Sequence, residues 1–175
     1  MRLISLALWG ICSLLHAQTV NPVSLNYPDR GFRLDENGSP FVDVQMENRS
    51  PKAVHAIGLL VLIKDGEGKT ARSFTHWIGM PLPGKPPVLV PAARRVFTLP
   101  LVQPSEDPAL ARHSLEIRLD YVRFGDGSDW GPDKTRSSFY FTGFESGVRL
   151  QKQHLRALLL KEGDAAVRKY LEENR

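Results

Sequence analysis

The sequence predicts a mainly β protein, an antiparallel β-sandwich that carries a C-terminal α-helical extension. About eight short segments rich in β-forming residues are separated by turn residues at regular intervals. The segment from Ser114 to Tyr121 alternates strictly between apolar and polar residues, as a strand with one buried face does. After Thr142 the pattern changes to leucines at helical spacing, and no proline occurs from there to the end.

The first 17 residues are typical of a secretory signal peptide. Arg2 precedes an apolar run from Leu3 to Leu15, and the small residue Ala17 follows. We therefore expect residues 1–17 to be removed and the protein to be exported, to a periplasm or to the extracellular space. Cys12 follows Ile11 rather than a small residue, so we do not expect a lipid anchor.

Charge and cysteine content exclude several classes of protein. Cys12 is the one cysteine, so the mature chain has no disulfide and depends on its core. The formal net charge is +4, with both signs mixed along the chain, which is not the clustered basic face of a nucleic-acid-binding protein. No second apolar stretch is long enough to span a membrane.

The predicted strands follow one another between turn signals, and their ranges are 19–29, 31–35, 41–48, 53–63, 70–78, 94–101, 114–124 and 137–142. Residues 53–63 are nearly all apolar, which predicts a central strand covered on both faces. Residues 80–91 contain five prolines and predict a crossing loop in which residues 88–90 touch a sheet edge. In 94–101 we expect Val96 to face inward, together with either Phe97 or Leu99.

The phase of the apolar pattern changes within 114–124. Leu115, Ile117 and Leu119 are expected to point into the sandwich, whereas Val122 and Phe124 lie on the other parity. Either a β-bulge shifts the phase, or this end of the strand is covered on both sides. An Asp-Gly turn follows, and we expect Trp130 to fold back over the strand that it leaves.

The helical extension is predicted over 143–175, after a sandwich of residues 18–142. Thr142 and Glu145 have the spacing of a capping box. Gly163 is expected to end the first helix, and a second helix is predicted from Ala165 to Glu173. The apolar residues of the two helices recur at helical spacing and are Val148, Leu155, Leu158, Leu159, Val167, Tyr170 and Leu171.

Three segments resemble a known group of domains. They are V-D-V-Q-M-E-N-R-S-P-K-A-V, D-G-E-G-K and M-P-L-P-G, within Phe41 to Leu101. Their Asn-x-Ser turn, central apolar strand, Asp-x-x-Gly turn and Pro-Gly loop are similar to immunoglobulin- or fibronectin-III-like domains of exported bacterial proteins, FxLYD-type domains among them. The Tyr-Asp motif of that group is absent, since Ile63-Lys64-Asp65 stands at its place. The resemblance implies an immunoglobulin-like sandwich that binds or spaces other molecules and has no catalytic residues.

Aspartates and histidines that could act in catalysis or bind a metal make an enzyme the alternative to a binding module. Asp126, Asp129 and Asp133 share one loop, but their spacing is not that of a calcium-binding helix–loop–helix, and turn chemistry explains them better. No two histidines have a short zinc-ligand spacing, and the Gly-x-Ser-x-Gly elbow of serine hydrolases is absent. We therefore expect no metal, no cofactor and no catalysis. The alternative is a hydrolase with a loop-built site around His76, His113 or Asp126.

Four aromatic residues suggest a second alternative, a carbohydrate-binding module. Trp77, Trp130, Tyr121 and Tyr140 include rings of the kind that stack on a sugar. Such rings more often fill the core or cap the end of a small sandwich, and we expect that role here.

The candidate interaction surface lies on the first predicted helix. An apolar stripe and a basic flank share one side of it, formed by Val148, Arg149, Lys152, Leu155, Arg156 and Leu159. We expect the stripe either to dock on the sandwich or to bind another protein or a second copy, with the basic flank meeting an acidic surface. Insertion at a membrane surface ranks third, because the stripe has no aromatic anchor.

Overall fold

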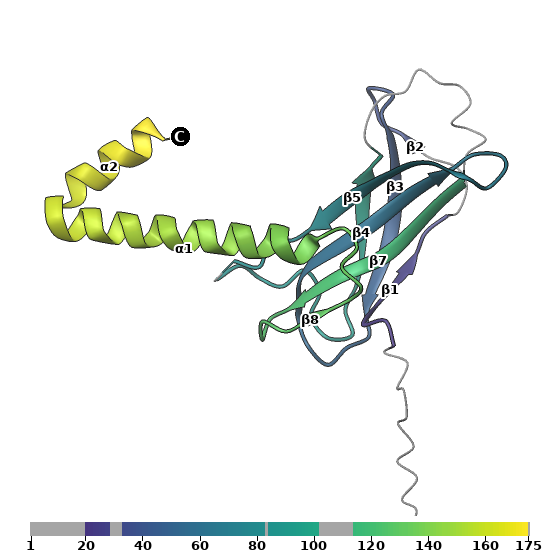
Figure 1. Ribbon diagram of the computed structural model, residues 1–175, viewed down its shortest axis with the longest axis horizontal. Helices are drawn as coiled ribbons and strands as arrows, with labels where there is room; N and C mark the ends of the chain where they lie inside the picture. The colour runs from purple at the N-terminus through teal and green to yellow at the C-terminus, as the bar shows by residue number, and fades with distance from the viewer. Residues whose placement is uncertain (1–19, 29–32, 83, 102–113, 175) are drawn as a thin grey trace, which may run out of the picture.

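The computed structural model describes residues 20–28, 33–82, 84–101 and 114–174, and the predicted signal peptide lies outside them. The fold is mainly β, with two four-stranded antiparallel sheets and a C-terminal helical extension, as predicted (Figure 1). In the first sheet, β3 pairs with β6 along one edge and with β1 and β2 along the other. Its strands are β1 (Val23–Asn26), β2 (Arg33–Leu34), β3 (Pro40–Asn48) and β6 (Arg94–Pro100).

The second sheet has the order β5-β4-β7-β8. Its strands are β4 (Val54–Lys64), β5 (Thr70–Ile78), β7 (Ser114–Phe124) and β8 (Asp129–Trp130). β4 lies between β5 and β7 and is buried along most of its length, which confirms the prediction of a central strand. The core between the sheets contains Val23, Val42, Val44, Met46, Val54, Ile57, Leu59, Val61, Ile63, Leu89, Leu99, Leu115, Ile117 and Val122.

A β-bulge in β7 explains the change of phase in its sequence. Leu119 pairs with Leu59 and Tyr121 with Gly58, so Asp120 is the extra residue. Val122 beyond the bulge therefore enters the core, while Tyr121 turns to the outer face. The two explanations predicted for the change of phase, a β-bulge and a strand end covered on both sides, therefore both apply, because a helix covers the outer face here.

The second edge of β7 is only partly paired. β8 pairs with Val122 and Arg123 alone. Further along, the Tyr27 hydroxyl donates a hydrogen bond to the carbonyl oxygen of Ile117 (3.1 Å) and accepts one from the Ile117 N–H (2.7 Å). A side chain thus takes the place of a neighbouring strand at this residue.

The predictions for strand β6 and for the proline-rich loop have different outcomes. Val96 is 64% exposed, whereas Leu99 is buried and Phe97 packs against the core. The expectation that Val96 faces inward is wrong, because residues 97 and 99 share the inner face in a period of two. The proline-rich loop does touch an edge as predicted, through an antiparallel bridge between Leu89 and Val54.

Helix α1 (Ser137–Glu162) begins earlier than predicted. Residues 137–142 form its first turns and not a strand, and Thr142 and Glu145 lie inside it, so the predicted hairpin and capping box are wrong. The start is fixed by Asp133, whose carboxylate accepts hydrogen bonds from the N–H (3.1 Å) and the hydroxyl of Ser138.

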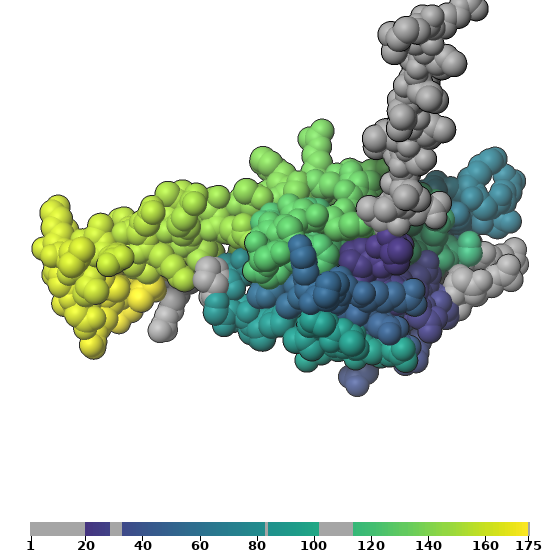
Figure 2. Space-filling model, turned by 90° about the horizontal axis from the view of Figure 1, so that it is seen from below, coloured from purple at the N-terminus to yellow at the C-terminus, as the bar shows by residue number. Residues whose placement is uncertain are grey.

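Gly163 ends α1 with φ 84°, as predicted, and helix α2 (Asp164–Glu173) follows. α1 extends away from the sandwich, and α2 folds back alongside the end of α1 (Figures 1 and 2). The ring centroids of His154 on α1 and Tyr170 on α2 are 5.0 Å apart. We call residues 150–174 the helical arm. No helix in the described ranges is both long and apolar enough to cross a membrane.

Candidate interaction site at the root of helix α1

The first turn of α1 is fixed to the outer face of the second sheet. Ser137 is fully buried, and its hydroxyl accepts a hydrogen bond from Nε1 of Trp77 (3.1 Å). The Thr135 hydroxyl lies 2.7 Å from the same oxygen. Beneath it is Gly58 of β4, where a Cβ atom would lie 2.3 Å from Ser137 Oγ and 2.8 Å from Ser137 Cβ. The absence of a side chain at Gly58 therefore lets the helix approach the sheet this closely.

Aromatic rings fill the space around this root. Phe141 is fully buried, with its ring 5.7 Å from that of Tyr121 and 5.4 Å from that of Tyr140. Tyr140 stacks on Trp77, with centroids 4.0 Å apart and planes 4° apart. Burial raises the pKa of Tyr121 to about 12. Tyr121 and Phe141 are buried and Trp130 is half-buried against the core, which is the packing role, whereas Trp77 is 39% exposed beside Tyr140.

The loop before α1 is held by the bulge residue of β7. Asp120 is buried, and its carboxylate accepts hydrogen bonds from the N–H groups of Lys134 (3.1 Å) and Thr135 (2.8 Å). The Thr135 hydroxyl donates a third, at 2.7 Å. The backbone of Gly131 passes so close that a Cβ atom there would lie 2.2 Å from the Asp120 carbonyl oxygen. The bulge and this loop together set where α1 starts.

The three loop aspartates have separate partners. Asp126 pairs with Lys52 (2.8 Å) and accepts a hydrogen bond from Ser128, and Lys52 holds the pKa of Asp126 well below its usual value. Asp129 pairs with Arg123 (2.6 Å), whereas Asp133 accepts a hydrogen bond from the Ser138 N–H in the first turn of α1. Within the part of the chain that the structure describes, no group of three potential metal ligands is found.

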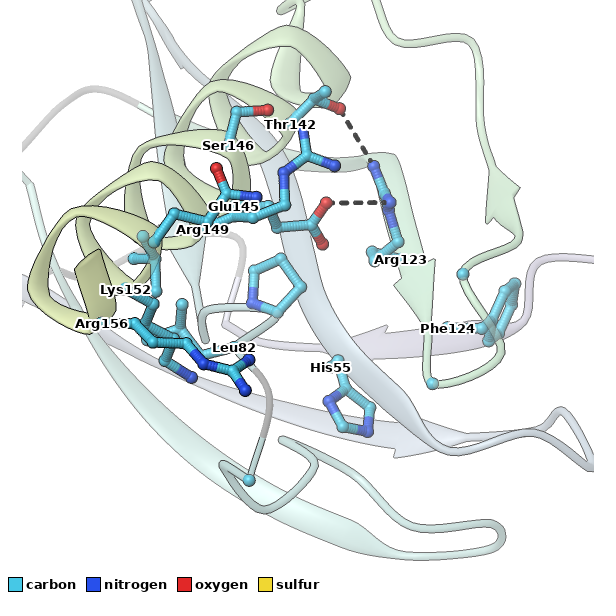
Figure 3. A pocket seen from close by; sticks show the side chains of 16 residues that line it. His55, Leu82, Arg123, Phe124, Thr142, Glu145, Ser146, Arg149, Lys152 and Arg156 are labelled. Atoms are coloured by element: carbon cyan, nitrogen blue, oxygen red, sulfur yellow. Dashed lines mark hydrogen bonds and ion pairs between the residues drawn. The ribbon is translucent and has the colours of Figure 1, made fainter. Parts of the chain in front are cut away.

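A hollow of about 840 Å³ opens between α1 and the end of the sandwich (Figure 3). One wall is the side of α1 that bears Arg149, Lys152 and Arg156, and Leu82 and His55 lie across from it. A smaller hollow of about 300 Å³ shares Leu82 and Lys152 with the first and adds Lys85. The lining of the larger one consists of His55, Pro81, Leu82, Gly84, Arg123, Phe124, Gly125, Gly127, Thr142, Glu145, Ser146, Val148, Arg149, Lys152, Gln153 and Arg156.

The hollow carries excess positive charge. Its one carboxylate, on Glu145, lies 3.5 Å from Arg123, which also pairs with Asp129. Among the described residues, no carboxylate lies within ion-pair distance of Arg149, Lys152 or Arg156. Three cations thus face a concave surface without a partner in the described ranges.

The predicted interaction residues divide into two groups. Val148, Arg149, Lys152 and Arg156 line the hollow. Leu155 is half-buried and Leu159 is 48% exposed, and neither lines the hollow. Sequence reasoning did not anticipate the opposite wall, because His55, Leu82, Lys85 and Arg123 come from segments far apart in the chain.

The described histidines lie in different surroundings. His55 lines the hollow, His76 lies on the opposite face of β5 from Trp77, and His154 contacts Tyr170 on the arm. His113 lies outside the described residues. Nothing in the described ranges brings a nucleophile and a base together around them, so the hydrolase alternative gains no support. The expectation that the chain is not an enzyme stays a prediction.

Comparisons with known proteins give a structural likeness but no family. No protein-family model matches the chain, and no curated protein matches it. A solved structure of a hypothetical protein from Peptoclostridium difficile 630 is similar with a TM-score of 0.45 and 12% sequence identity, covering 69% of this chain and 92% of that one. A likeness at this level assigns neither a ligand nor an activity.

Proposed function

We propose that this protein is an exported, non-catalytic binding or scaffolding module that holds a partner protein through its helical arm. The observation that carries the proposal is the exposure of leucines on the arm. Leu160 is 81% exposed and Leu159 48%, and Leu150 and Leu171 are exposed as well. No other described part of the chain covers them. At the root of the same helix Ser137 and Phe141 are fully buried, although Phe139 there is 80% exposed.

Burial of these side chains favours association. Removing a leucine side chain from water is worth about 1.5–3 kcal/mol, so a partner that covers three or four of them gains several kcal/mol before the entropy of association is counted. The basic residues Arg149, Lys152 and Arg156 beside them favour a partner with an acidic surface. A membrane surface is a weaker occupant, because the candidate stripe has no aromatic anchor.

The root makes the arm suitable for scaffolding. Ser137 and Phe141 are both fully buried, and Asp133 and Asp120 fix the loop that leads into α1. A partner bound to the arm is thereby held in a defined orientation relative to the sandwich. The other role expected for this helix is docking on the sandwich. Only its first turns dock, through Ser137 and Phe141, whereas the leucines of the arm stay exposed to solvent.

The strand pairing supports the resemblance to immunoglobulin- and fibronectin-III-like domains. Taken in chain order, the strands are named A, A′, B, C, C′, E, F and G. A, A′, B and E then lie in one sheet and C′, C, F and G in the other. Exported domains of this kind usually bind or space other molecules. Together with the predicted signal peptide of residues 1–17, this favours a binding role outside the cytoplasm.

The test replaces leucines of the arm and compares them with apolar residues exposed on the sandwich. Leu159→Ser, Leu160→Ser and Leu171→Ser are combined in one full-length chain, and the control combines Val20→Ser, Leu34→Ser and Val96→Ser, which are also exposed. In a pull-down from an extract of the native cell envelope, we expect the native chain and the control variant to retain the same partner proteins. We expect the arm variant to lose them. Size-exclusion chromatography with light scattering separates self-association from binding of another protein. An arm variant that keeps every partner and its oligomeric state contradicts the proposal.

A further inference from the structure

The hollow at the root of α1 has a charge and shape that the arm's leucines do not explain. Arg149, Lys152 and Arg156 are exposed cations on one wall, and the adjoining smaller hollow adds Lys85. The one carboxylate of the lining, on Glu145, faces Arg123. Because Glu145 is already paired with Arg123, the electrostatic potential in the hollow is set by Arg149, Lys152 and Arg156 and is positive.

We infer that this hollow binds an extended acidic peptide segment, one that carries carboxylates and apolar side chains, of the partner protein. The inference rests on the proposed function, since it assigns part of the same partner to a second contact, where the arm joins the sandwich.

The spacing of the cations favours a chain over a point charge. Arg149, Lys152 and Arg156 are three and four residues apart along α1, so they form a row about 10 Å long on one side of the helix. A single phosphate needs donors that converge on it, whereas a row faces successive carboxylates of a chain. The length corresponds to about three residues of an extended peptide at about 3.3 Å per residue.

The rest of the lining favours a peptide over other polyanions. Pro81, Leu82 and Val148 give the hollow an aliphatic side, which suits leucine or valine side chains between the carboxylates. A neutral sugar chain or a single-stranded nucleic acid gains much of its affinity by stacking on open aromatic faces. Of the two aromatic rings in the lining, that of Phe124 is 8% exposed and that of His55 is half-buried, so neither offers an open face.

The experiment measures binding of a synthetic peptide by the full chain. The probe is a fluorescein-labelled peptide of glutamates and leucines, followed by fluorescence anisotropy. A peptide with glutamine in place of glutamate, and a sulfated polysaccharide, serve as competitors.

The test variant combines Arg149→Gln, Lys152→Gln and Arg156→Gln. The charge-matched control combines Lys69→Gln, Arg72→Gln and Arg95→Gln, which are exposed on the sandwich. A further variant, Arg149→Lys with Arg156→Lys, keeps the charge, and circular dichroism checks that each variant folds.

We expect the acidic peptide to bind the native chain and its Kd to rise about tenfold or more in the test variant, as the loss of several exposed ionic contacts predicts. The control and the lysine variant should bind like the native chain. Binding should also weaken when salt shortens the screening length from about 10 Å to about 3 Å. No binding by the native chain, equal binding by the test variant, or equal competition by the glutamine peptide overturns the inference. Preferential displacement by the polysaccharide overturns the assignment to a peptide.

This outcome is separable from that of the proposed function. If the arm variant loses its partner while the test variant at the hollow binds both partner and peptide like the native chain, the inference fails and the proposed function stands. If the arm variant keeps all partners, the proposed function fails, whatever the peptide assay shows.

Discussion

Gly58→Ala tests whether the close approach of α1 to β4 fixes the helical arm. The new Cβ atom would lie 2.3 Å from Ser137 Oγ, 2.8 Å from Ser137 Cβ and 3.2 Å from Tyr121 Cβ. Ser137 Cβ is attached directly to the helix backbone, so the helix itself must move to remove the clash. Forcing one extra methyl group into a packed site costs about 1–3 kcal/mol, and we expect the free energy of unfolding to fall by that amount. The backbone of Gly58 does not have a positive φ, so the clash is the main effect of the substitution.

The assay is denaturant unfolding followed by tryptophan fluorescence. Trp77 donates its hydrogen bond to Ser137, so its emission reports on the root directly. Gly66→Ala is the matched control, since a Cβ atom there meets nothing within 4 Å. In thermal unfolding, each kcal/mol corresponds to a Tm decrease of about 2–4 °C for a domain of this size.

A double-mutant cycle with Ser137→Gly identifies the cause. Alone, Ser137→Gly removes the acceptor of the Trp77 hydrogen bond and is expected to cost about 1–2 kcal/mol. Combined with Gly58→Ala, it removes the two nearest of the three atoms that the new methyl group meets and leaves only Tyr121 Cβ at 3.2 Å, so the two costs should not add. Additive costs, or a Gly58→Ala chain as stable as Gly66→Ala, would refute the view that steric fit at this point fixes the arm.

Four further predictions concern the sandwich. Tyr27→Phe removes both hydrogen bonds to Ile117 and should cost about 1–3 kcal/mol and speed amide exchange at Ile117; unchanged exchange there would contradict it. Burial lowers the pKa of His76 from its ordinary value of 6.5. The unfolded chain therefore takes up a proton before the folded chain does, so stability should fall as the pH drops below 6.5 towards the folded-state pKa; His76→Gln should make this part of the Tm–pH curve flatter. Trp130→Ala should cost about 1–3 kcal/mol in denaturant unfolding, less than the 3–5 kcal/mol of a fully buried ring, because Trp130 is half-buried. Chelator should leave the Tm unchanged, since Asp126 is already paired with Lys52; a rise in Tm with calcium that Asp126→Ala abolishes would contradict this.

The regular strands were predictable because one residue pattern fits one geometry. β3 alternates buried and half-buried residues along its whole length, and a register shift of one residue would expose Val42, Val44 and Met46 together. β6 was less predictable, because Val96 and Phe97 offer apolar side chains on both parities. Only pairing with β3 in the folded sheet decides between them.

The start of α1 was not predictable from local preference. Residues 137–142 read S-S-F-Y-F-T and are rich in aromatic residues that favour strands. Tertiary contacts override this preference, since Gly58 makes room for Ser137 and the Asp133 carboxylate accepts a hydrogen bond from the Ser138 N–H. The cationic row of the hollow was visible in the helical spacing of Arg149, Lys152 and Arg156. Its opposite wall was not, because no local pattern indicates that Leu82 and His55 lie near the same helix.

The buried first turn of α1 makes the rest of that helix a lever. With 26 residues, α1 is about 39 Å long, so a rotation of one degree about Ser137 moves the far end near Gly163 by about 0.7 Å. A tilt of about three degrees at the first turn therefore displaces the far end of α1 by about 2 Å. Under the proposed function, the precision with which the arm would present a partner depends on the close fit at Gly58, together with the contacts of Asp120, Asp133 and Phe141.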